Sequence, residues 1–263
     1  MTALPVALEI TPPKAPNPEV LLRRARLLGE RASAVHVIQR ADRQPSLDAA
    51  RELERAGVSA VWHLVNRGRT RADIEREIEQ AALSGLRAAL VVRGEAGPPE
   101  PMPSPSLAGL VARIRGAIPD ARIGVTLNPY LPPERALANL WPKLEAGAAF
   151  VQTQPIFEPA RLAPFAAEVR ARFPQVRIVP MLIPLPSVAA AEQIGQRLRV
   201  PLPEGLLRRL EDGGEPAGWI AFAELVRRLA HAGLADDLAV MTHAADPPKP
   251  FGERLAAALA ATQ

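Results

Sequence analysis

The sequence predicts an α/β protein built as a single (β/α)8 TIM barrel, and three observations favour this fold class. Short apolar segments alternate about eight times with longer amphipathic segments. Strict alternation of this kind implies parallel strands joined by right-handed crossovers. An eightfold count favours closure of the sheet, and 263 residues is close to the length that α/β barrels use as one domain.

The expected strands are the short apolar segments, in which β-branched residues are frequent. They cover Val6–Thr11, Ala34–Gln39, Ala60–Val65, Ala88–Val92, Arg122–Leu127, Phe150–Gln154, Arg177–Ile183 and Leu238–Thr242. The expected helices are the amphipathic segments between them. They cover Glu19–Glu30, Leu47–Ala56, Arg71–Ser84, Leu107–Ala117, Pro133–Glu145, Ala160–Phe173, Val188–Leu198, Pro203–Leu210, Trp219–Ala232 and Phe251–Ala261.

Several element boundaries carry the residues that such boundaries prefer. Ser46 and Thr70 are expected N-caps, and Pro133 suits the first turn of a helix. A glycine is expected to end a helix directly before a strand at four places, Gly57, Gly85, Gly147 and Gly233. No G-x-G-x-x-G turn follows the first strand, which weakens the alternative of an open dinucleotide-binding sheet.

Two segments interrupt the alternation without marking a domain boundary. Ala96–Ser106 is a proline-rich loop after the fourth strand, and proline removes the backbone donors that a helix or strand needs. An extended helical insertion, around residues 186–233, lengthens the unit before the last strand. Both halves of the chain are needed for eight strands, so residues 1–263 are expected to form one domain.

The composition excludes several functional classes. There are no cysteines, which removes disulfides, thiolate metal sites and cysteine nucleophiles. The pI is about 10.2, but the arginines are spread along the helices and aromatic residues make up only 4%. This pattern does not favour nucleic-acid binding. No signal peptide or membrane segment is recognisable, so a cytoplasmic protein without a membrane partner is expected.

Polar side chains gather at the carboxyl ends of the expected strands, where the sites of α/β barrels are built. Seven of the eight strands contribute one or more of them. They are Glu9, Gln39, Arg40, His63, Asn66, Arg93, Gly94, Glu95, Asn128, Gln154, Thr242 and His243. Solvated strand ends are polar in any barrel, so each residue taken alone has a purely structural alternative.

Glu9 carries most of the functional signal. It lies in the apolar sequence Val6-Ala7-Leu8-Glu9-Ile10, where desolvation would raise the pKa of its carboxyl group. A glutamate of this kind can donate a proton near neutral pH. The alternative, a core-edge glutamate paired with an arginine, stays open.

The other strand-end groups fit recognition of a polar ligand. Arg93-Gly94-Glu95 offers a cation, a backbone that a ligand can approach closely, and an acceptor. Gln154 can donate and accept at once, which suits the edge of a pterin or flavin ring. No pair of histidines has the H-x-x-x-H spacing, so no metal site is expected.

An ordered set of motifs resembles the methylenetetrahydrofolate reductase family. Leu8-Glu9-Ile10-Thr11-Pro12-Pro13-Lys14 resembles the family's E-F-F-P-P-K, His63-Leu64 its H-L-T, and Arg93-Gly94-Glu95 its R/T-G-D. Gln39-Arg40 continues the match after the second strand, and Gly124-Val125 with Asn128-Pro129 stands where the family has G-V-A-x-Y-P. Lys143 to Ala148, followed by Thr153-Gln154, resembles K-x-D-A-G-A and T-Q-x-x-F-D. The resemblance runs from about Ala7 to Pro184.

The resemblance implies an FAD barrel that reduces 5,10-methylenetetrahydrofolate to 5-methyltetrahydrofolate with NADH or NADPH. Glu9 would protonate the folate and open its five-membered ring, and Glu95 would stabilise the resulting cation. Gln39 and Gln154 would bind the folate substrate. The expected cofactor contacts are His63, Arg93, Gly94, Asn128, Lys143 and Ala148.

The sequence departs from the family at positions that concern the flavin. Ile10 and Thr11 replace two phenylalanines. In the loop Asn128–Pro133 the family's tyrosine and histidine, which contribute to flavin binding, are missing from their positions, and Tyr130 is displaced by two residues. Three alternatives therefore remain: a flavin-dependent reductase, a flavin-independent folate enzyme that transfers hydride directly or takes part in methyl transfer, and a folate-binding subunit without catalysis. The subunit count is also open, with a homo-oligomer among the alternatives.

Overall fold

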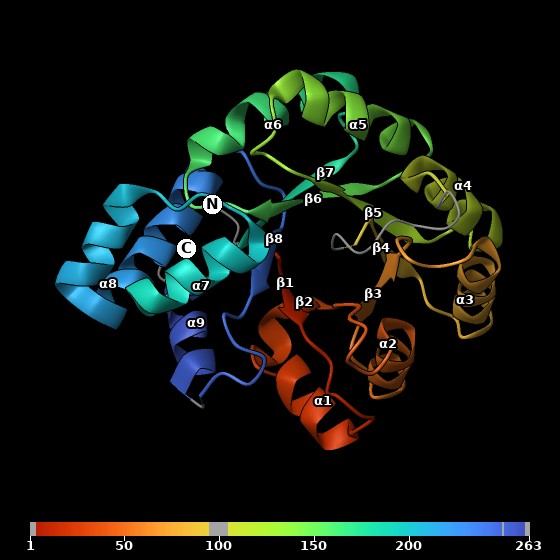
Figure 1. Ribbon diagram of the computed structural model, residues 1–263, viewed down its shortest axis with the longest axis horizontal. Coiled ribbons are helices and arrows are strands. Elements are labelled where there is room, and N and C mark those ends of the chain that lie inside the picture. Colours follow the sequence, from red (N-terminus) through yellow and green to blue (C-terminus); the bar gives the residue numbers. More distant parts are fainter. Residues whose placement is uncertain (1–3, 95–104, 249, 261–263) are drawn as a thin grey trace.

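The computed structural model describes residues 4–94, 105–248 and 250–260, and these form a closed parallel barrel. Its strands follow one another around the barrel in chain order, from β1 to β8, and β8 pairs with β1. Figure 1 shows the strands at the centre with the helices around them. The predicted (β/α)8 fold class is therefore confirmed.

The strand bounds agree with the expected segments to within two residues at either end. They are β1 Val6–Ile10, β2 Ala32–Val37, β3 Ala60–Val65, β4 Ala88–Val92, β5 Arg122–Leu127, β6 Phe150–Pro155, β7 Arg177–Leu182 and β8 Leu238–Met241. The α-helices are α1 Pro18–Ala25, α2 Ser46–Arg55, α3 Arg71–Leu83, α4 Leu107–Ala117, α5 Pro133–Glu145, α6 Ala163–Arg172, α7 Val188–Leu198, α8 Glu204–His231 and α9 Pro250–Ala260. Two short 3-10 helices, η1 Gly29–Arg31 and η2 Pro159–Arg161, precede β2 and α6.

The strands bury both of their faces, and alternation along each strand separates two cores. Leu8, Val35 and Trp62 belong to the larger cluster, which packs the barrel against its helices. Apolar residues at the alternate positions, such as Val61 and Leu90, belong to a smaller cluster, which extends from the barrel interior to residues of α7 and α8. Glu9, His36, His63 and Gln152 occupy the inward-facing positions of their strands. Strand periodicity thus places four polar side chains inside the barrel.

Phe150, the first residue of β6, fills the barrel interior at the amino end of that strand. Its ring covers Gly124 of β5 so closely that a Cβ at position 124 would lie 2.1 Å from the ring. The ring of His36 lies 6.0 Å from that of Phe150, centroid to centroid. Phe150 therefore forms an apolar floor beneath the inward-facing polar side chains.

The helix boundaries confirm most of the expected capping residues and correct one. The Thr70 hydroxyl accepts the backbone N–H of Asp73, as an N-cap does, and the four predicted terminating glycines have positive φ angles. Ser46 is not an N-cap, because α2 begins at Ser46 and Pro45 precedes it as the cap residue. Its hydroxyl instead donates to the carbonyl of Val37.

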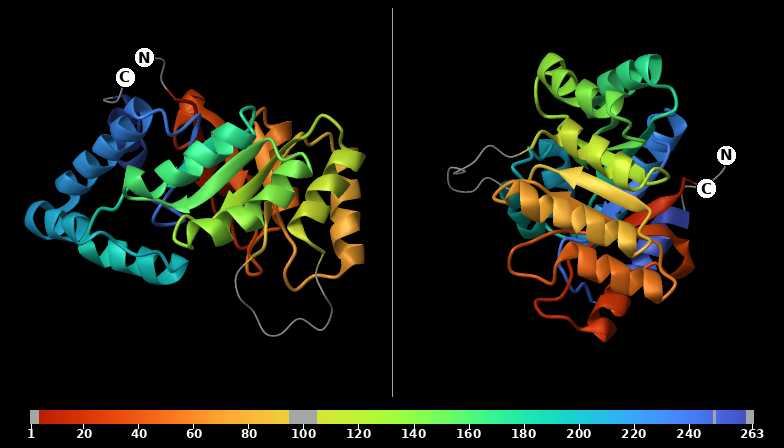
Figure 2. Two further views of the ribbon diagram at one scale, coloured as in Figure 1. Left: turned by 90° about the horizontal axis from the view of Figure 1, so that it is seen from above. Right: turned by 90° about the vertical axis from the view of Figure 1, so that its right-hand side faces the viewer.

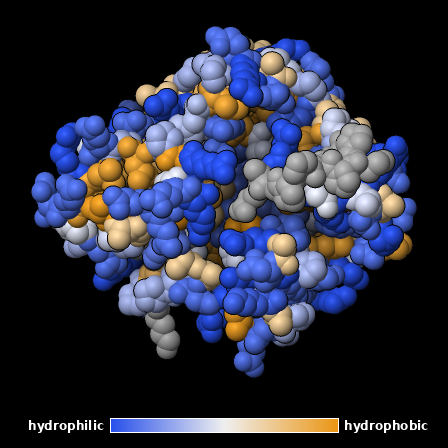
Figure 3. Space-filling model, in the orientation of Figure 1, coloured by the Kyte–Doolittle hydropathy of each residue, from blue (hydrophilic) through white to orange (hydrophobic). Residues whose placement is uncertain are grey.

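The stretch before β8 is longer than the other βα units, as expected. The two helices predicted there form α8, which is interrupted at Gly214, where φ is +56°. Figure 2 shows α7 and α8 extending beyond the strands at one side of the barrel. Apolar surface gathers over these two helices in Figure 3. Leu202, Leu206 and Leu207 are partly buried and pack against the smaller cluster.

The proline-rich segment and one candidate residue fall largely outside the described part of the chain. Residues 95–104 are not described, and they include Glu95. Ser106, at the end of the segment, caps α4 by accepting the backbone N–H of Gly109. Within the described ranges, no helix has the length and apolar character needed to cross a membrane.

Candidate functional site

Glu9 lies on the inward face of β1 and is only 4% exposed. Its Oε2 accepts a hydrogen bond of 2.8 Å from the side-chain amide of Gln152 on β6. Burial raises the pKa of Glu9 to about 7, and the hydrogen bond from Gln152 opposes part of that rise. Glu9 therefore holds a proton over much of the range in which a general acid is useful at neutral pH.

Two buried histidines lie beside Glu9, on the next two strands. His36 on β2 is paired in register with Glu9, and His63 Nε2 on β3 lies 4.0 Å from Glu9 Oε2. Their rings meet edge to face with centroids 5.7 Å apart. Burial lowers the pKa of His36 to about 3, with a further contribution from Arg122, and burial also holds the pKa of His63 well below its ordinary value. Both imidazoles are therefore neutral at physiological pH.

Buried polar atoms without a partner mark the same region. Among the described residues, four of them belong to inward-facing side chains, namely His36 Nδ1, His63 Nε2, Gln152 Oε1 and Gln154 Oε1. Buried polar groups in native proteins are nearly always hydrogen-bonded to protein, water or ligand. Four such atoms on three strands of one barrel form a group that water or a polar ligand has to satisfy.

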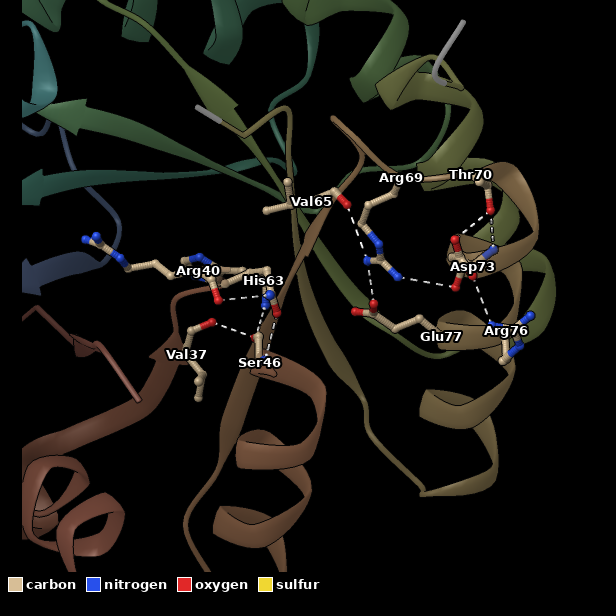
Figure 4. A network of polar contacts seen from close by, with 11 residues as sticks. Val37, Arg40, Ser46, His63, Val65, Arg69, Thr70, Asp73, Arg76 and Glu77 are labelled. Atoms are coloured by element: carbon tan, nitrogen blue, oxygen red, sulfur yellow. Dashed lines mark hydrogen bonds and ion pairs between the residues drawn. The ribbon is translucent and has the colours of Figure 1, made fainter. Parts of the chain in front are cut away.

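A hydrogen-bonded serine fixes the strand that carries His63. The buried Ser46 hydroxyl donates to the carbonyl of Val37 and accepts the backbone N–H of His63, at 2.7 and 2.8 Å. Figure 4 shows Ser46 between the two strands. Gln39, expected to bind substrate, uses its carbonyl oxygen to accept the backbone N–H of Ser46. Its side chain therefore holds the start of α2.

Residues at the end of β4 are in the expected place but serve the fold as well. Arg93 is exposed after the strand, and its carbonyl accepts the backbone N–H of Arg67. Gly94 has a φ of +91°, and a Cβ there would lie 2.5 Å from a methyl group of Val65. Packing against β3 thus requires glycine at position 94, whether or not a ligand approaches it.

The loop after β5 is organised by its own residues. The Asn128 side-chain oxygen accepts the backbone N–H of Tyr130, which makes a local turn. The Tyr130 hydroxyl donates to the carbonyl of Pro155, at the end of β6. Asn128, expected to contact a cofactor, uses its acceptor for this turn.

Two of the expected cofactor residues lie away from the inward-facing cluster. Lys143 is buried on α5, and its ammonium donates 2.9 Å to the carbonyl of Thr126. Ala148 is buried directly before β6, at the amino end of the strand, and its contact with a cofactor stays a prediction. Its backbone N–H bonds to the carbonyl of Lys143 and closes the end of α5.

Sequence reasoning missed His36 and Gln152. His36 lies in the middle of the expected strand Ala34–Gln39, away from its carboxyl end, and Gln152 precedes the motif that the resemblance covers. The signal that would have found them is period-two alternation. His36 stands between buried Val35 and Val37, in the same way that Glu9 stands between Leu8 and Ile10.

The cluster also bears on the expectation of no metal. Glu9, His36 and His63 each offer one ligand atom, and these atoms lie within 4.8 Å of one another. Spacing along one helix could not reveal a group built from three strands. Two features favour a proton over a cation: the Gln152 N–H points at the carboxylate oxygen nearest His63, and burial raises the pKa of Glu9. The absence of a metal stays a prediction.

Comparison with known proteins agrees with these observations. The family model described as "Methylenetetrahydrofolate reductase" matches residues 2–242. The chain belongs to the methylenetetrahydrofolate reductase family. A curated relative, a "Probable methylenetetrahydrofolate reductase (NADPH)" of Caenorhabditis elegans, is 27% identical over 209 residues. That match covers 74% of this chain but 32% of the relative, so the chain spans about a third of the relative's length.

Solved structures share the fold at low sequence identity. A Clostridium thermocellum protein, whose title states that it binds two copies of 5-methyl-5,6,7,8-tetrahydrofolic acid, has a TM-score of 0.65 and 16% identity. The match covers 99% of this chain and 94% of that protein. Tryptophan synthase from M. tuberculosis has a TM-score of 0.55 and 15% identity, over 99% of this chain and 91% of that one. At these identities the likeness shows the fold alone.

Proposed function

We propose that this family member binds a reduced folate inside the carboxyl end of the barrel and reduces 5,10-methylenetetrahydrofolate to 5-methyltetrahydrofolate. Reduced nicotinamide, NADH or NADPH, would supply the hydride. The observation that carries the proposal is Glu9: a buried carboxyl group, protonated near neutral pH, at the family's acid position and beside unpartnered polar atoms.

The proposed chemistry needs one proton and one hydride. Glu9 donates its proton to N10 of the folate, and the bond between N10 and the methylene carbon breaks to leave an iminium cation at N5. Hydride from the nicotinamide then bonds to that carbon, which becomes the methyl group, and the nicotinamide is oxidised. A proton from solvent restores Glu9. Gln154, whose side-chain oxygen lacks a protein partner, would accept a hydrogen bond from the pterin.

The described residues do not fit a resident flavin well. Of the side chains that the resemblance assigns to it, Asn128 forms a local turn, and Lys143 bonds to the carbonyl of Thr126. Ala148 lies at the amino end of its strand. His63 Nε2 lies 4.0 Å from Glu9 Oε2, beside the proposed proton donor. We therefore derive no step through FAD, and we favour direct transfer of hydride from the nicotinamide to the folate.

A folate-binding protein that carries out no reduction is the second candidate. It is favoured by the Clostridium thermocellum structure, whose title names bound 5-methyltetrahydrofolate and whose fold covers 99% of this chain. A protein of this kind would use the same inward-facing residues. It would bind methyltetrahydrofolate but would not need a protonated Glu9.

Three measurements on the purified protein test the proposal. An absorption spectrum and a calorimetric titration with FAD should show no bound flavin and no sub-micromolar affinity. Anaerobic oxidation of NADH or NADPH should depend on 5,10-methylenetetrahydrofolate and proceed without added FAD. Activity that appears only with FAD would overturn direct hydride transfer. Tight folate binding without any nicotinamide oxidation would favour the second candidate.

A further inference from the structure

We propose that Gln152 is the positioning residue for the proton donor Glu9. Its amide holds one carboxyl oxygen, Oε2, and leaves the other, Oε1, to carry the proton to the folate. This inference rests on the proposed function. The family motif around β6 covers Thr153 and Gln154 and gives Gln152 no role.

The contact is a buried hydrogen bond that crosses the barrel interior, and it is called the brace below. Gln152 Nε2 lies 2.8 Å from Glu9 Oε2, and both residues are buried, at 1% and 4% exposure. The contact joins β1 to β6, which are not neighbours in the sheet. Within the described chain, no hydrogen bond reaches Glu9 Oε1. One oxygen is therefore held in place while the other is left for a ligand.

The residues around Glu9 support this difference between its two carboxyl oxygens. On β2 and β3, His36 and His63 are held neutral by burial, and His63 Nε2 approaches Oε2 rather than Oε1. On β8 the residue paired with Glu9 is Met241, which does not titrate. Arg122 and Asp237, the charged residues that act on His36, form an ion pair with each other. Gln152 is thus the one described side chain that hydrogen-bonds to the Glu9 carboxyl group.

The contact has a consequence with a definite sign. A hydrogen bond donated to a carboxylate favours the charged form, so Gln152 keeps the pKa of Glu9 lower than burial alone would set it. Loss of the donor should raise this pKa by about one unit, since hydrogen bonds to charged groups are among the stronger ones. A residue that merely filled space at position 152 would not have this effect.

The first experiment needs no substrate. Infrared difference spectra of the intact protein, recorded as a function of pH against the Glu9→Gln variant, report the ionisation of the Glu9 carboxyl group. Gln152→Met keeps a similar length and removes the donor. It should move the ionisation upward by about one pH unit. Gln154→Met, two residues along the same strand, is the matched control and should leave it in place.

The second experiment asks whether the brace serves catalysis. The pH dependence of kcat/KM should shift upward in Gln152→Met, because the acid form persists to higher pH. At low pH kcat should fall about tenfold, since the proton is no longer aimed, while KM for the folate changes little. Gln154→Met should do the reverse, raising KM without shifting the pH profile.

The outcomes separate this inference from the proposed function. An unchanged infrared ionisation in Gln152→Met overturns the inference, whatever the activity. A shifted ionisation in a protein with no reductase activity supports the Gln152–Glu9 contact and overturns the proposed function instead. If Gln152→Met does not fold, Gln152→Glu replaces it. A second carboxyl group against Glu9 should split the ionisation into two steps, one below and one above the wild-type value, and a single unshifted step overturns the inference.

Discussion

Two sets of residues that the family resemblance brings together differ sharply in the structure. Glu9 and Gln154, expected to act on the folate, face the barrel interior, and each keeps an oxygen for which the described residues provide no hydrogen bond. Asn128 and Lys143 are expected to contact the flavin. The Asn128 side-chain oxygen and the Lys143 ammonium are engaged by the backbone of this chain. The two residues expected at the folate thus keep an oxygen for a ligand, whereas these two expected flavin residues use polar atoms in the fold. His63, also expected at the flavin, faces the interior with Nε2 unpartnered among the described residues.

The difference teaches that a motif can be kept for two reasons. A strand-end residue whose polar atoms have no partner in the protein can bind a ligand. A residue whose polar atoms close a turn or a helix end stabilises the fold. Gly94 shows the second case, because its positive φ and its packing on Val65 explain the glycine without any ligand. The following predictions test the contrast, beginning with the largest expected effect.

The Glu9→Gln variant tests the folate side most directly. Glutamine keeps the shape of the side chain but cannot donate a proton to N10, so kcat should fall by about 100-fold or more, the usual effect of losing a positioned acid. Folate affinity measured by calorimetry should stay within a few-fold of wild type. Glu134→Gln, on the exposed first turn of α5, is the control and should be fully active. Near-normal turnover in Glu9→Gln would remove Glu9 from the mechanism.

The pH dependence of the proposed reaction in the wild-type protein tests the role of Glu9 a second way. Because burial raises the pKa of Glu9 to about 7, the acid form predominates below that pH and is lost above it. The value of kcat/KM should therefore fall about tenfold for each pH unit above about 7. Stopped-flow measurement of nicotinamide oxidation across pH 6 to 9 provides the check. A profile that is flat to pH 9 would mean that Glu9 is not the proton donor.

The sequence predicted the barrel well because its pattern is local. Each apolar segment, and each helix-terminating glycine such as Gly57 or Gly85, can be recognised from a few consecutive residues. The strands accordingly lie close to where they were expected. The candidate site was predicted only in part. Contacts such as that between Glu9 and Gln152, which are 143 positions apart, depend on the register of distant strands, and no local pattern encodes that register.

Ser46 illustrates how a local interpretation can be right about importance and wrong about cause. It resembles an N-cap, yet its buried hydroxyl joins the carbonyl of Val37 to the N–H of His63. Ser46→Ala would leave both backbone groups unpaired in the core, so the free energy of unfolding should fall by about 2 kcal/mol. Urea denaturation provides the measurement. Ser33→Ala, at an exposed position on β2, should change stability by much less, and equal losses would contradict the bridging role.

Lys143 provides the smallest predicted effect and the most direct test of the flavin side. Burial lowers its pKa to about 8 from an ordinary value of 10.5, so between these pH values the unfolded chain binds more protons than the folded one. The contribution of Lys143 to the free energy of unfolding should therefore rise with pH, by about 1 kcal/mol from pH 7 to pH 9. Lys143→Met removes the titrating group and keeps the length of the side chain.

The measurement is the difference in unfolding free energy between Lys143→Met and wild type at the two pH values, which cancels the other titrating groups. If Lys143 serves only the fold, the variant should lose this increment while the affinity for folate and the response to added FAD stay unchanged. The opposite outcome is a variant whose unfolding free energy depends on pH as in the wild type but which has lost tight FAD binding. Lys143 would then belong to a flavin site, and the contrast between the two sides of the barrel would fail at that residue.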